Sequence, residues 1–282
     1  MTIFYAILLG IIQGLTEFIP VSSTAHLTLA GKAMGVINYD KPEEWTAFIA
    51  VIQLGSLLAV IAYFWSDILH IITGFVRTNL SYINKRPVQH GDRINGLLGW
   101  MVILGTLPAA IIGLLFKHQI EGVFTKDLRV ISVALIALAI VLMVAEWTGT
   151  QRRDMRNLRL GDALVVGIAQ VFALIPGCSR SGSTITGGLF SGLTRETAAR
   201  FSFLLSIPAI GASGLLELPK AWKVVDHTIL MIAILATIIS SYATIAFLIR
   251  FLQRHSTYSF AAYRIGIGLV ILALLMMGKI SA

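Results

Sequence analysis

Two polar segments interrupt an otherwise apolar chain and carry the side chains best suited to chemistry. The first is GIIQGLTEFIPVSST, residues 10–24, and the second is GIAQVFALIPGCSRSGST, residues 167–184. In both, Gly-Ile-x-Gln is followed by Ile-Pro and a hydroxyl-rich cluster, which indicates an internal duplication. The copies differ in ionisable residues, since Glu17 and His26 belong to the first and Arg180 to the second. Such residues are costly in apolar surroundings and are therefore functional candidates.

The acidic residue of the first segment has a polar neighbour at helical spacing. Gln13 and Glu17 are four residues apart, so both side chains project from one face of a helix. A carboxylate and an amide oxygen there could hold a divalent cation, Mg²⁺ or Ca²⁺. Alternatively, Glu17 caps the following helix, hydrogen-bonds within the bundle, or pairs with His26 or Arg180, because a buried carboxylate needs a partner in every case.

The residues that follow Glu17 predict the start of a second short helix. Pro20 suits the first turn of a helix, and Ser22, Ser23 and Thr24 supply capping hydroxyls. Free backbone N–H groups at such a terminus favour an anion. Ser23 and His26 are three residues apart, which suits a hydroxyl nucleophile beside a general base or acid. Alternatively, these hydroxyls bond to backbone carbonyls of their own helix or pack against a neighbouring helix.

The second segment has the composition of a site for an oxyanion or a phosphate group. Its candidate binding residues are Ser179, Arg180, Ser181, Gly182 and Thr184. Glycine lets the backbone approach a ligand closely, hydroxyl and N–H groups donate hydrogen bonds, and arginine binds phosphate through two donors. The structural alternative is that Arg180 neutralises Glu17 across the repeat.

Composition places these segments in a membrane. The 282 residues are 56% hydrophobic and only 13% charged, with a mean hydropathy of +0.83, whereas soluble domains have about 25% charged residues. Uncharged stretches of spanning or near-spanning length are 45–66, 94–116, 130–145, 201–216, 228–249 and 265–278. The polar stretch 67–93 is expected to be a loop. A single cysteine, Cys178, excludes an intrachain disulfide.

The two polar segments do not fit simple spans, because their apolar parts are short and end at Pro20 and Pro176. Irregular backbone at membrane depth requires burial in protein or a wet cavity. We therefore predict an all-α polytopic membrane protein in which each half has one re-entrant helical hairpin and three transmembrane helices. Three is an odd number of spans, so the second half begins on the opposite side of the membrane from the first. The duplication is then an inverted-topology repeat. The expected halves are 1–147, with its hairpin at 2–36, and 161–282, with its hairpin at 161–193.

The distribution of arginine and lysine predicts the orientation. Thirteen Arg and Lys residues fall on one side, with Arg264 counted among them, against eight on the other, and RRDMRNLR is the densest run of the majority side. The rule that positive loops stay inside makes that side cytoplasmic, including the basic loop 148–160. Both termini and the mouth of the first hairpin then face outward. We read the net charge of +8 as this topology signal together with attraction to anionic membrane lipids. No nucleic-acid partner is expected.

At these residues the chain resembles the bacterial undecaprenyl-diphosphate phosphatases of the bacitracin-resistance type. That family has an (E/Q)xxxE motif followed by PVSST and a histidine, here Gln13 to Glu17, Pro20 to Thr24, and His26. It also has PGxSRSxxT, here Pro176 to Thr184. The stretches IQLGSLLAV and FSFLLSIP are similar to family sequence as well, so the resemblance covers nearly the whole chain. The first motif begins with Gln13 instead of glutamate, which leaves one fewer carboxylate for a cation.

The resemblance implies a polyisoprenyl diphosphate substrate whose tail lies in the bilayer of the bacterial inner membrane. Its headgroup would enter an outward-open pocket, where Arg180 and a cation near Glu17 neutralise its charge. Ser23 would be the nucleophile, His26 would pass protons, and Glu17 would orient these groups or act as the base. The alternatives are attack by His26 or by metal-bound water. The sequence is compatible with both a monomer and a homodimer.

Without the motifs, the inverted repeat and the broken hairpins would favour a different class. A secondary transporter or a lipid flippase would show the same repeats and the same anion-binding centre. Transport is therefore the alternative function, and release of phosphate would distinguish the two.

Overall fold

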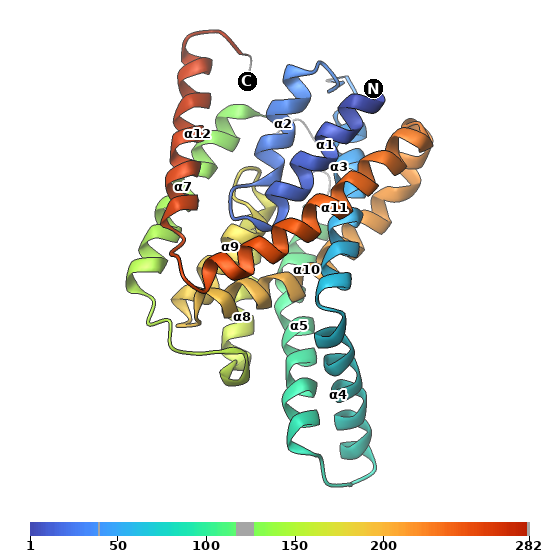
Figure 1. Ribbon diagram of the computed structural model, residues 1–282, viewed down its shortest axis with the longest axis vertical. Coiled ribbons are helices and arrows are strands. Elements are labelled where there is room, and N and C mark those ends of the chain that lie inside the picture. Colours follow the sequence, from blue (N-terminus) through green and yellow to red (C-terminus); the bar gives the residue numbers. More distant parts are fainter. Residues whose placement is uncertain (39, 117–126, 281–282) are drawn as a thin grey trace.

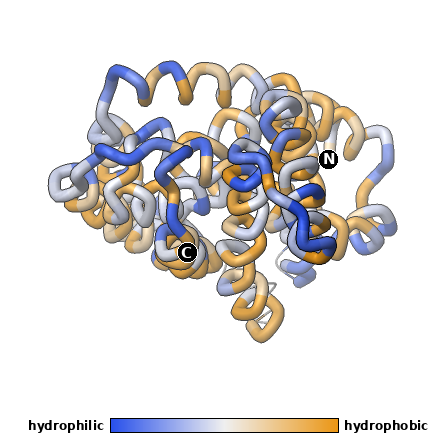
Figure 2. The backbone as a smooth tube through the Cα atoms, turned by 90° about the horizontal axis from the view of Figure 1, so that it is seen from below, coloured by the Kyte–Doolittle hydropathy of each residue, from blue (hydrophilic) through white to orange (hydrophobic). Residues whose placement is uncertain are grey.

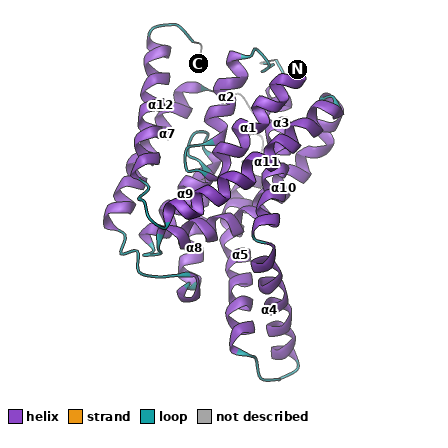
Figure 3. Cartoon of the chain, viewed as in Figure 1, coloured by secondary structure: helices purple, strands orange, loops and turns teal. Residues whose placement is uncertain are grey.

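The computed structural model of the chain describes residues 1–38, 40–116 and 127–280. Over these residues the fold is helical (Figure 3), and its only extended pairing is an isolated bridge between Arg153 and Leu193. Six of the described helices are long and apolar enough to cross a membrane. They match the six spans expected from the sequence, so the prediction of an all-α chain with six candidate spans is confirmed.

Figure 1 shows the arrangement of the helices. Their bounds are α1 Ile3–Phe18, α2 Ser23–Ala33, α3 Pro42–Tyr63, α4 Trp65–Ile83, α5 His90–Leu115, α7 Leu128–Thr148, α8 Leu160–Val171, α9 Arg180–Phe190, α10 Arg195–Val224, α11 His227–Leu252 and α12 Tyr258–Met276. Short 3-10 turns cover Met155–Asn157 and Phe172–Leu174. Figure 2 shows hydrophobic residues along most of the helical tube. A helix suits such a sequence because it satisfies its backbone polar groups internally.

The stretch 67–93, expected to be a loop, is largely helical, and this expectation was wrong. Helix α4 covers Trp65–Ile83 and packs against α5, and the two project together from the rest of the molecule (Figure 1). Its exposed apolar residues recur every three or four positions: Trp65, Leu69, Ile72, Val76, Leu80 and Ile83. This period defines one apolar face of a helix. The charged residues between them obscured that face when the stretch was judged by polarity.

Helices from the first half of the chain pack against helices from the second half. Helix α1 packs against α11, α8 against α5, α3 against α10, and α7 against α12. Glycines allow close approaches in two of these contacts: a Cβ atom on Gly10 would collide with the carbonyl of Ala233, and one on Gly167 would lie 2.5 Å from the carbonyl oxygen of Gly105. Gly10 and Gly167 occupy the same position in the two polar segments. Small residues thus bring the first helix of each segment against the opposite half.

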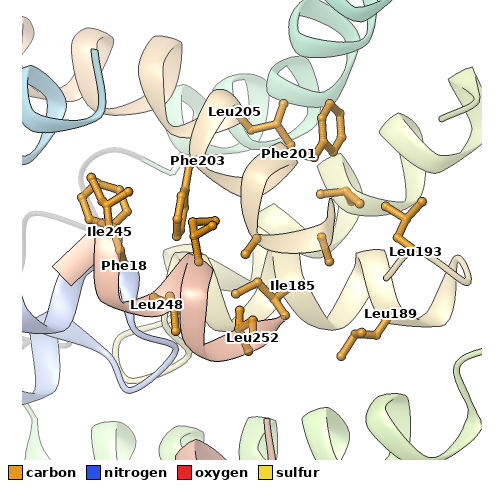
Figure 4. Packing of buried hydrophobic residues seen from close by; sticks show 14 of the residues in the cluster. Phe18, Ile185, Leu189, Leu193, Phe201, Phe203, Leu205, Ile245, Leu248 and Leu252 are labelled. Carbon is orange, nitrogen blue, oxygen red and sulfur yellow. The ribbon is translucent and has the colours of Figure 1, made fainter. Parts of the chain in front are cut away.

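A buried apolar cluster fixes the end of α1. The ring of Phe18 meets the ring of Phe203 from α10 edge to face, with a centroid separation of 4.9 Å. Ile185 from α9 and Ile245 from α11 belong to the same cluster (Figure 4). Edge-to-face aromatic pairs are favourable beyond the area they bury. Because Phe18 directly follows Glu17, this packing holds the position of the acidic side chain.

Candidate active site

Two short helices begin at matched positions of the two polar segments. Helix α2 begins at Ser23 after the N-cap Ser22, whose hydroxyl accepts from the N–H of Ala25. Helix α9 begins at Arg180 after the N-cap Ser179, whose hydroxyl accepts from the N–H of Gly182. A serine cap of this kind contributes about 1 kcal/mol. The expectation that a serine would cap the helix is confirmed.

The two capping serines share an unusual backbone. Ser22 has a φ of 75° and Ser179 a φ of 67°. Positive φ is disfavoured for residues with a Cβ atom, and such strain gathers at functional sites. Pro20 lies in the turn before the cap, and the expectation that it would occupy the first turn of α2 was wrong. The turn takes the chain into the strained cap before the helix begins.

The first residues of the two helices contact one carboxylate. Arg180 Nη2 donates to Glu17 Oε1 at 2.6 Å, and Ser23 Oγ donates to Glu17 Oε2 at 2.7 Å. Gln13 Nε2 also donates to Glu17 Oε2, at 2.8 Å. These four residues, here called the Glu17 cluster, are largely or fully buried. The sequence predicted the members of this cluster, and the structure brings all four together.

The helix termini give the Glu17 cluster a positive character. The N-termini of α2 and α9 each carry a partial positive charge, and Arg180 adds a full one. The other amino group of Arg180, Nη1, is buried and has no hydrogen-bond partner among the described residues. A buried charged donor without a partner is costly unless a ligand satisfies it. This arrangement can accept an anion larger than one carboxylate.

The pair Gln13 and Glu17 offers a cation two oxygen ligands. Gln13 Oε1 is buried without a hydrogen-bond partner in the described structure. No group of three or more His, Cys, Asp or Glu residues converges anywhere in the described residues. A divalent cation could therefore bind one carboxylate and one amide oxygen here, with its other ligands from phosphate or water. Mg²⁺ is commonly bound in this way.

Two further hydroxyls of the second segment, those of Ser181 and Thr184, hold the loops together. Ser181 Oγ donates to the carbonyl oxygens of Glu17 and Ile19, at 3.2 Å in both cases. Thr184 Oγ1 donates to the carbonyl of Arg180 at 2.7 Å and lies 2.6 Å from Ser202 Oγ on α10. These contacts join the second loop to the first and to the bundle. Direct binding of an oxyanion by these hydroxyls stays a prediction.

His26 has partners other than Ser23. Its Nδ1 lies 2.7 Å from the carbonyl oxygen of Ser22, and its Nε2 lies 2.7 Å from the hydroxyl of Tyr263. The rings of His26 and Tyr263 are nearly parallel, with centroids 5.7 Å apart. The residue that faces Ser23 is therefore Glu17, whereas the spacing had suggested His26. Thr24 is half-buried in the first turn of α2.

Two residues of α12 reach the site, and the sequence did not identify either. Tyr263 contacts His26, and Arg264 is fully buried and contacts both loops. Arg264 was counted among the loop arginines that set the topology, which was wrong. The signal was present, because apolar residues begin four positions earlier at Phe260, which places the arginine inside the apolar run. An ionisable residue within such a run is a functional candidate.

An apolar groove adjoins the loop of the second segment. It has a volume of about 840 Å³ and lies between α7, α8 and α9. Cys178 and Ser183 line it beside the site, and Ala137 and Phe172 line it further away. Its lining is almost wholly apolar apart from Ser183, Thr186 and Arg129. The groove can accommodate a hydrocarbon chain whose polar end lies near α9.

Known proteins are similar to this chain over nearly its whole length. The family described as Bacitracin resistance protein BacA matches residues 6–270. A protein of Syntrophobacter fumaroxidans named undecaprenyl-diphosphatase is 54% identical over 272 residues, which are 95% of each chain. Proteins of the same name from Chloroherpeton thalassium and Prosthecochloris aestuarii are 46% and 47% identical, each over 100% of both chains.

Proposed function

The chain belongs to the bacitracin resistance protein BacA family, and we propose that it hydrolyses undecaprenyl diphosphate to undecaprenyl phosphate and inorganic phosphate. The reaction recycles the lipid carrier of cell-wall synthesis and confers resistance to bacitracin. The names and the full-length similarity of the relatives support this substrate. One observation of the site carries the proposal: Arg180 binds Glu17 through Nη2 while its buried Nη1 has no partner in the described residues.

The diphosphate binds where the two helix N-termini meet. Arg180 turns its unpaired amino group to the terminal phosphate, and the fork of the guanidinium suits two phosphate oxygens. The N-termini of α2 and α9 stabilise the negative charge as it moves to the leaving oxygen. The same groups hold the phosphorus in line with the nucleophile, which is the main requirement of phosphoryl transfer.

Ser23 is the nucleophile of this reaction. Its hydroxyl already donates to Glu17 Oε2, so Glu17 accepts the proton as Ser23 Oγ attacks the terminal phosphorus. Undecaprenyl phosphate leaves, and a phosphoserine remains. One water molecule then hydrolyses the phosphoserine, which restores the serine and releases phosphate. His26, held by Ser22 and Tyr263, passes protons between this site and the exterior.

Gln13 and Glu17 would hold a divalent cation, Mg²⁺ or Ca²⁺, through the unpaired Gln13 Oε1 and the Glu17 carboxylate. When bound, the cation neutralises part of the charge of the diphosphate. Because Arg180 contacts Glu17 in the described structure, its guanidinium turns from the carboxylate to bind two phosphate oxygens.

The isoprenoid tail of the substrate lies in the groove between α7, α8 and α9. Cys178 lines the groove and stands two residues from Arg180, so a chain in the groove has its headgroup end beside the site. The lining of the groove is about as apolar as the surrounding lipid, so a hydrocarbon tail passes from the bilayer into the groove without meeting buried polar groups. The groove can therefore hold a long hydrocarbon tail.

The chain is a multi-pass membrane protein, and its two halves form an inverted repeat. The paired packing of α1 with α11 and of α8 with α5 supports this arrangement. The equivalent caps Ser22 and Ser179 support it further. In this arrangement α1–α2 and α8–α9 are re-entrant hairpins in the inner membrane. Both termini and the site face outward.

Release of phosphate tests the function against transport. Purified protein in detergent is given undecaprenyl diphosphate with and without a chelator, and free phosphate is measured. The proposal predicts release that the chelator suppresses, and no release by an Arg180→Ala variant. A secondary transporter or flippase would release none, and that result with folded protein would overturn the proposal.

A further inference from the structure

The buried guanidinium of Arg264 contacts both halves of the site. Its Nη1 donates to the carbonyl oxygen of Pro20 at 3.3 Å. Its Nη2 donates to the carbonyl oxygens of Gly177 and Cys178, at 3.1 Å each. Its Nε donates to the carbonyl oxygen of Leu135 at 3.2 Å. The side chain is 0% exposed, and no carboxylate pairs with it within the described residues.

These carbonyls belong to the two turns that lead into the short helices. Pro20 lies two residues before the cap Ser22, and Cys178 directly precedes the cap Ser179. One guanidinium therefore fixes the distance between the start of α2 and the start of α9. Only a planar fork with several donors can bind carbonyls in these different directions at once.

We infer that Arg264 is a positioning residue, which holds the two loops so that Ser23 and Arg180 meet at one phosphate. The inference rests on the proposed function. Arg264 acts through the loop backbone and not on the reacting atoms. Misplacement of catalytic groups by about 1 Å can cost about 100-fold in rate.

Gly182 provides a second position at which the role of Arg264 can be tested. A Cβ atom at Gly182 would lie 2.5 Å from Nη1 of Arg264. The absence of a side chain at this position therefore makes room for the guanidinium. An alanine there pushes against Arg264, whereas it has more room beside a lysine, which lacks that amino group. The two positions must be coupled if Arg264 aligns the site.

The first experiment compares two Arg→Lys variants in detergent with undecaprenyl diphosphate. We expect Arg264→Lys to lower kcat by about 100-fold while its Tm falls no more than that of Arg153→Lys. Arg153 is the matched control, because it also binds a carbonyl, that of Ser191, together with the carboxylate of Asp162. Equal kcat values for the two variants would overturn the inference.

The second experiment is a double-mutant cycle on kcat. Gly182→Ala should lower kcat in the wild-type chain, and it should change kcat by less than about twofold in the Arg264→Lys background. If the fold-losses of kcat from the two single substitutions multiply in the double variant, the inference is overturned. Where Arg264→Lys does not fold, Arg264→Gln takes its place in both experiments. Gly161→Ala, at a site where a Cβ meets open space, is the control for the Tm of Gly182→Ala.

Failure of this inference differs from failure of the proposed function. A folded wild-type protein that releases no phosphate contradicts the function itself. An active wild-type protein whose Arg264→Lys variant is as active as Arg153→Lys contradicts only the positioning role.

Discussion

The hydroxyl of Ser23 donates a hydrogen bond of 2.7 Å to the carboxylate of Glu17. The same carboxylate accepts from Arg180, which lies 163 positions further along the chain. One acidic side chain thus joins the first residue of α2 to the first residue of α9. In the proposed reaction Ser23 is the nucleophile, Glu17 is its base and Arg180 binds the phosphate. Two hydrogen bonds connect these three residues.

Glu17→Gln tests the role of the carboxylate as a base. An amide cannot accept the proton of Ser23, so we expect kcat to fall on the order of 10³-fold. Activity should also respond less to added Mg²⁺ or Ca²⁺, because one of the two protein ligands is weakened. Glu146→Gln is the control, since Glu146 is a buried carboxylate that binds Arg195 and Thr257. An unchanged metal response would place the cation elsewhere.

Arg180→Lys tests the binding of phosphate by a fork of donors. Lysine keeps the charge but lacks the second oriented donor, so we expect kcat to fall by about 100-fold. Phosphate release is measured beside that of Arg195→Lys, in which the arginine of another, partly buried ion pair is exchanged. Full activity of the Arg180 variant would count against recognition by two donors.

Tyr263→Phe tests whether His26 depends on α12. The change removes the hydrogen bond to Nε2, and a single net hydrogen bond corresponds to about a 3-fold to 10-fold loss of kcat. Tyr258→Phe, an exchange at an exposed tyrosine of the same helix, is the control. If both variants turn over equally, the contact with Tyr263 has no part in proton transfer.

Ala137→Trp tests the groove for the isoprenoid tail. The indole should fill part of the groove and raise the KM for undecaprenyl diphosphate by about tenfold, with little effect on a short prenyl diphosphate. Ile140→Trp places the same ring on the exposed lipid face of α7, outside the groove lining. A KM that rises equally for both chain lengths would show that the tail lies elsewhere.

The sequence predicted much of the fold, because long uncharged runs and short proline-terminated ones have distinct physical meanings. Six runs became the six candidate spans, and the two short ones became α1 and α8. Helix α4 was not predicted, because the charged residues of the stretch masked the three-to-four-residue spacing of its apolar side chains. The pairing of Glu17 with Arg180 could be predicted, since each buried charge requires a partner.

The hydrogen-bond partners of His26 could not be predicted from spacing. Residues three apart can share a helix face, but the carbonyl of Ser22 and the hydroxyl of Tyr263 occupy the imidazole. Tyr263 and Arg264 lie about 80 positions beyond the second segment, and only tertiary packing brings them to the loops. Such contacts leave no local pattern, although an arginine inside an apolar run is a usable signal.

Phosphate release by Ser23→Ala is the most direct test of the account. The variant is purified in detergent, its Tm is compared with those of the wild type and of Ser132→Ala, and kcat for undecaprenyl diphosphate is measured. Ser132 donates only to a backbone carbonyl of its own helix in the described structure. The account predicts that kcat falls by more than about 10³-fold in Ser23→Ala with an unchanged Tm. Substantial turnover by the folded variant would contradict it and would favour attack by His26 or water.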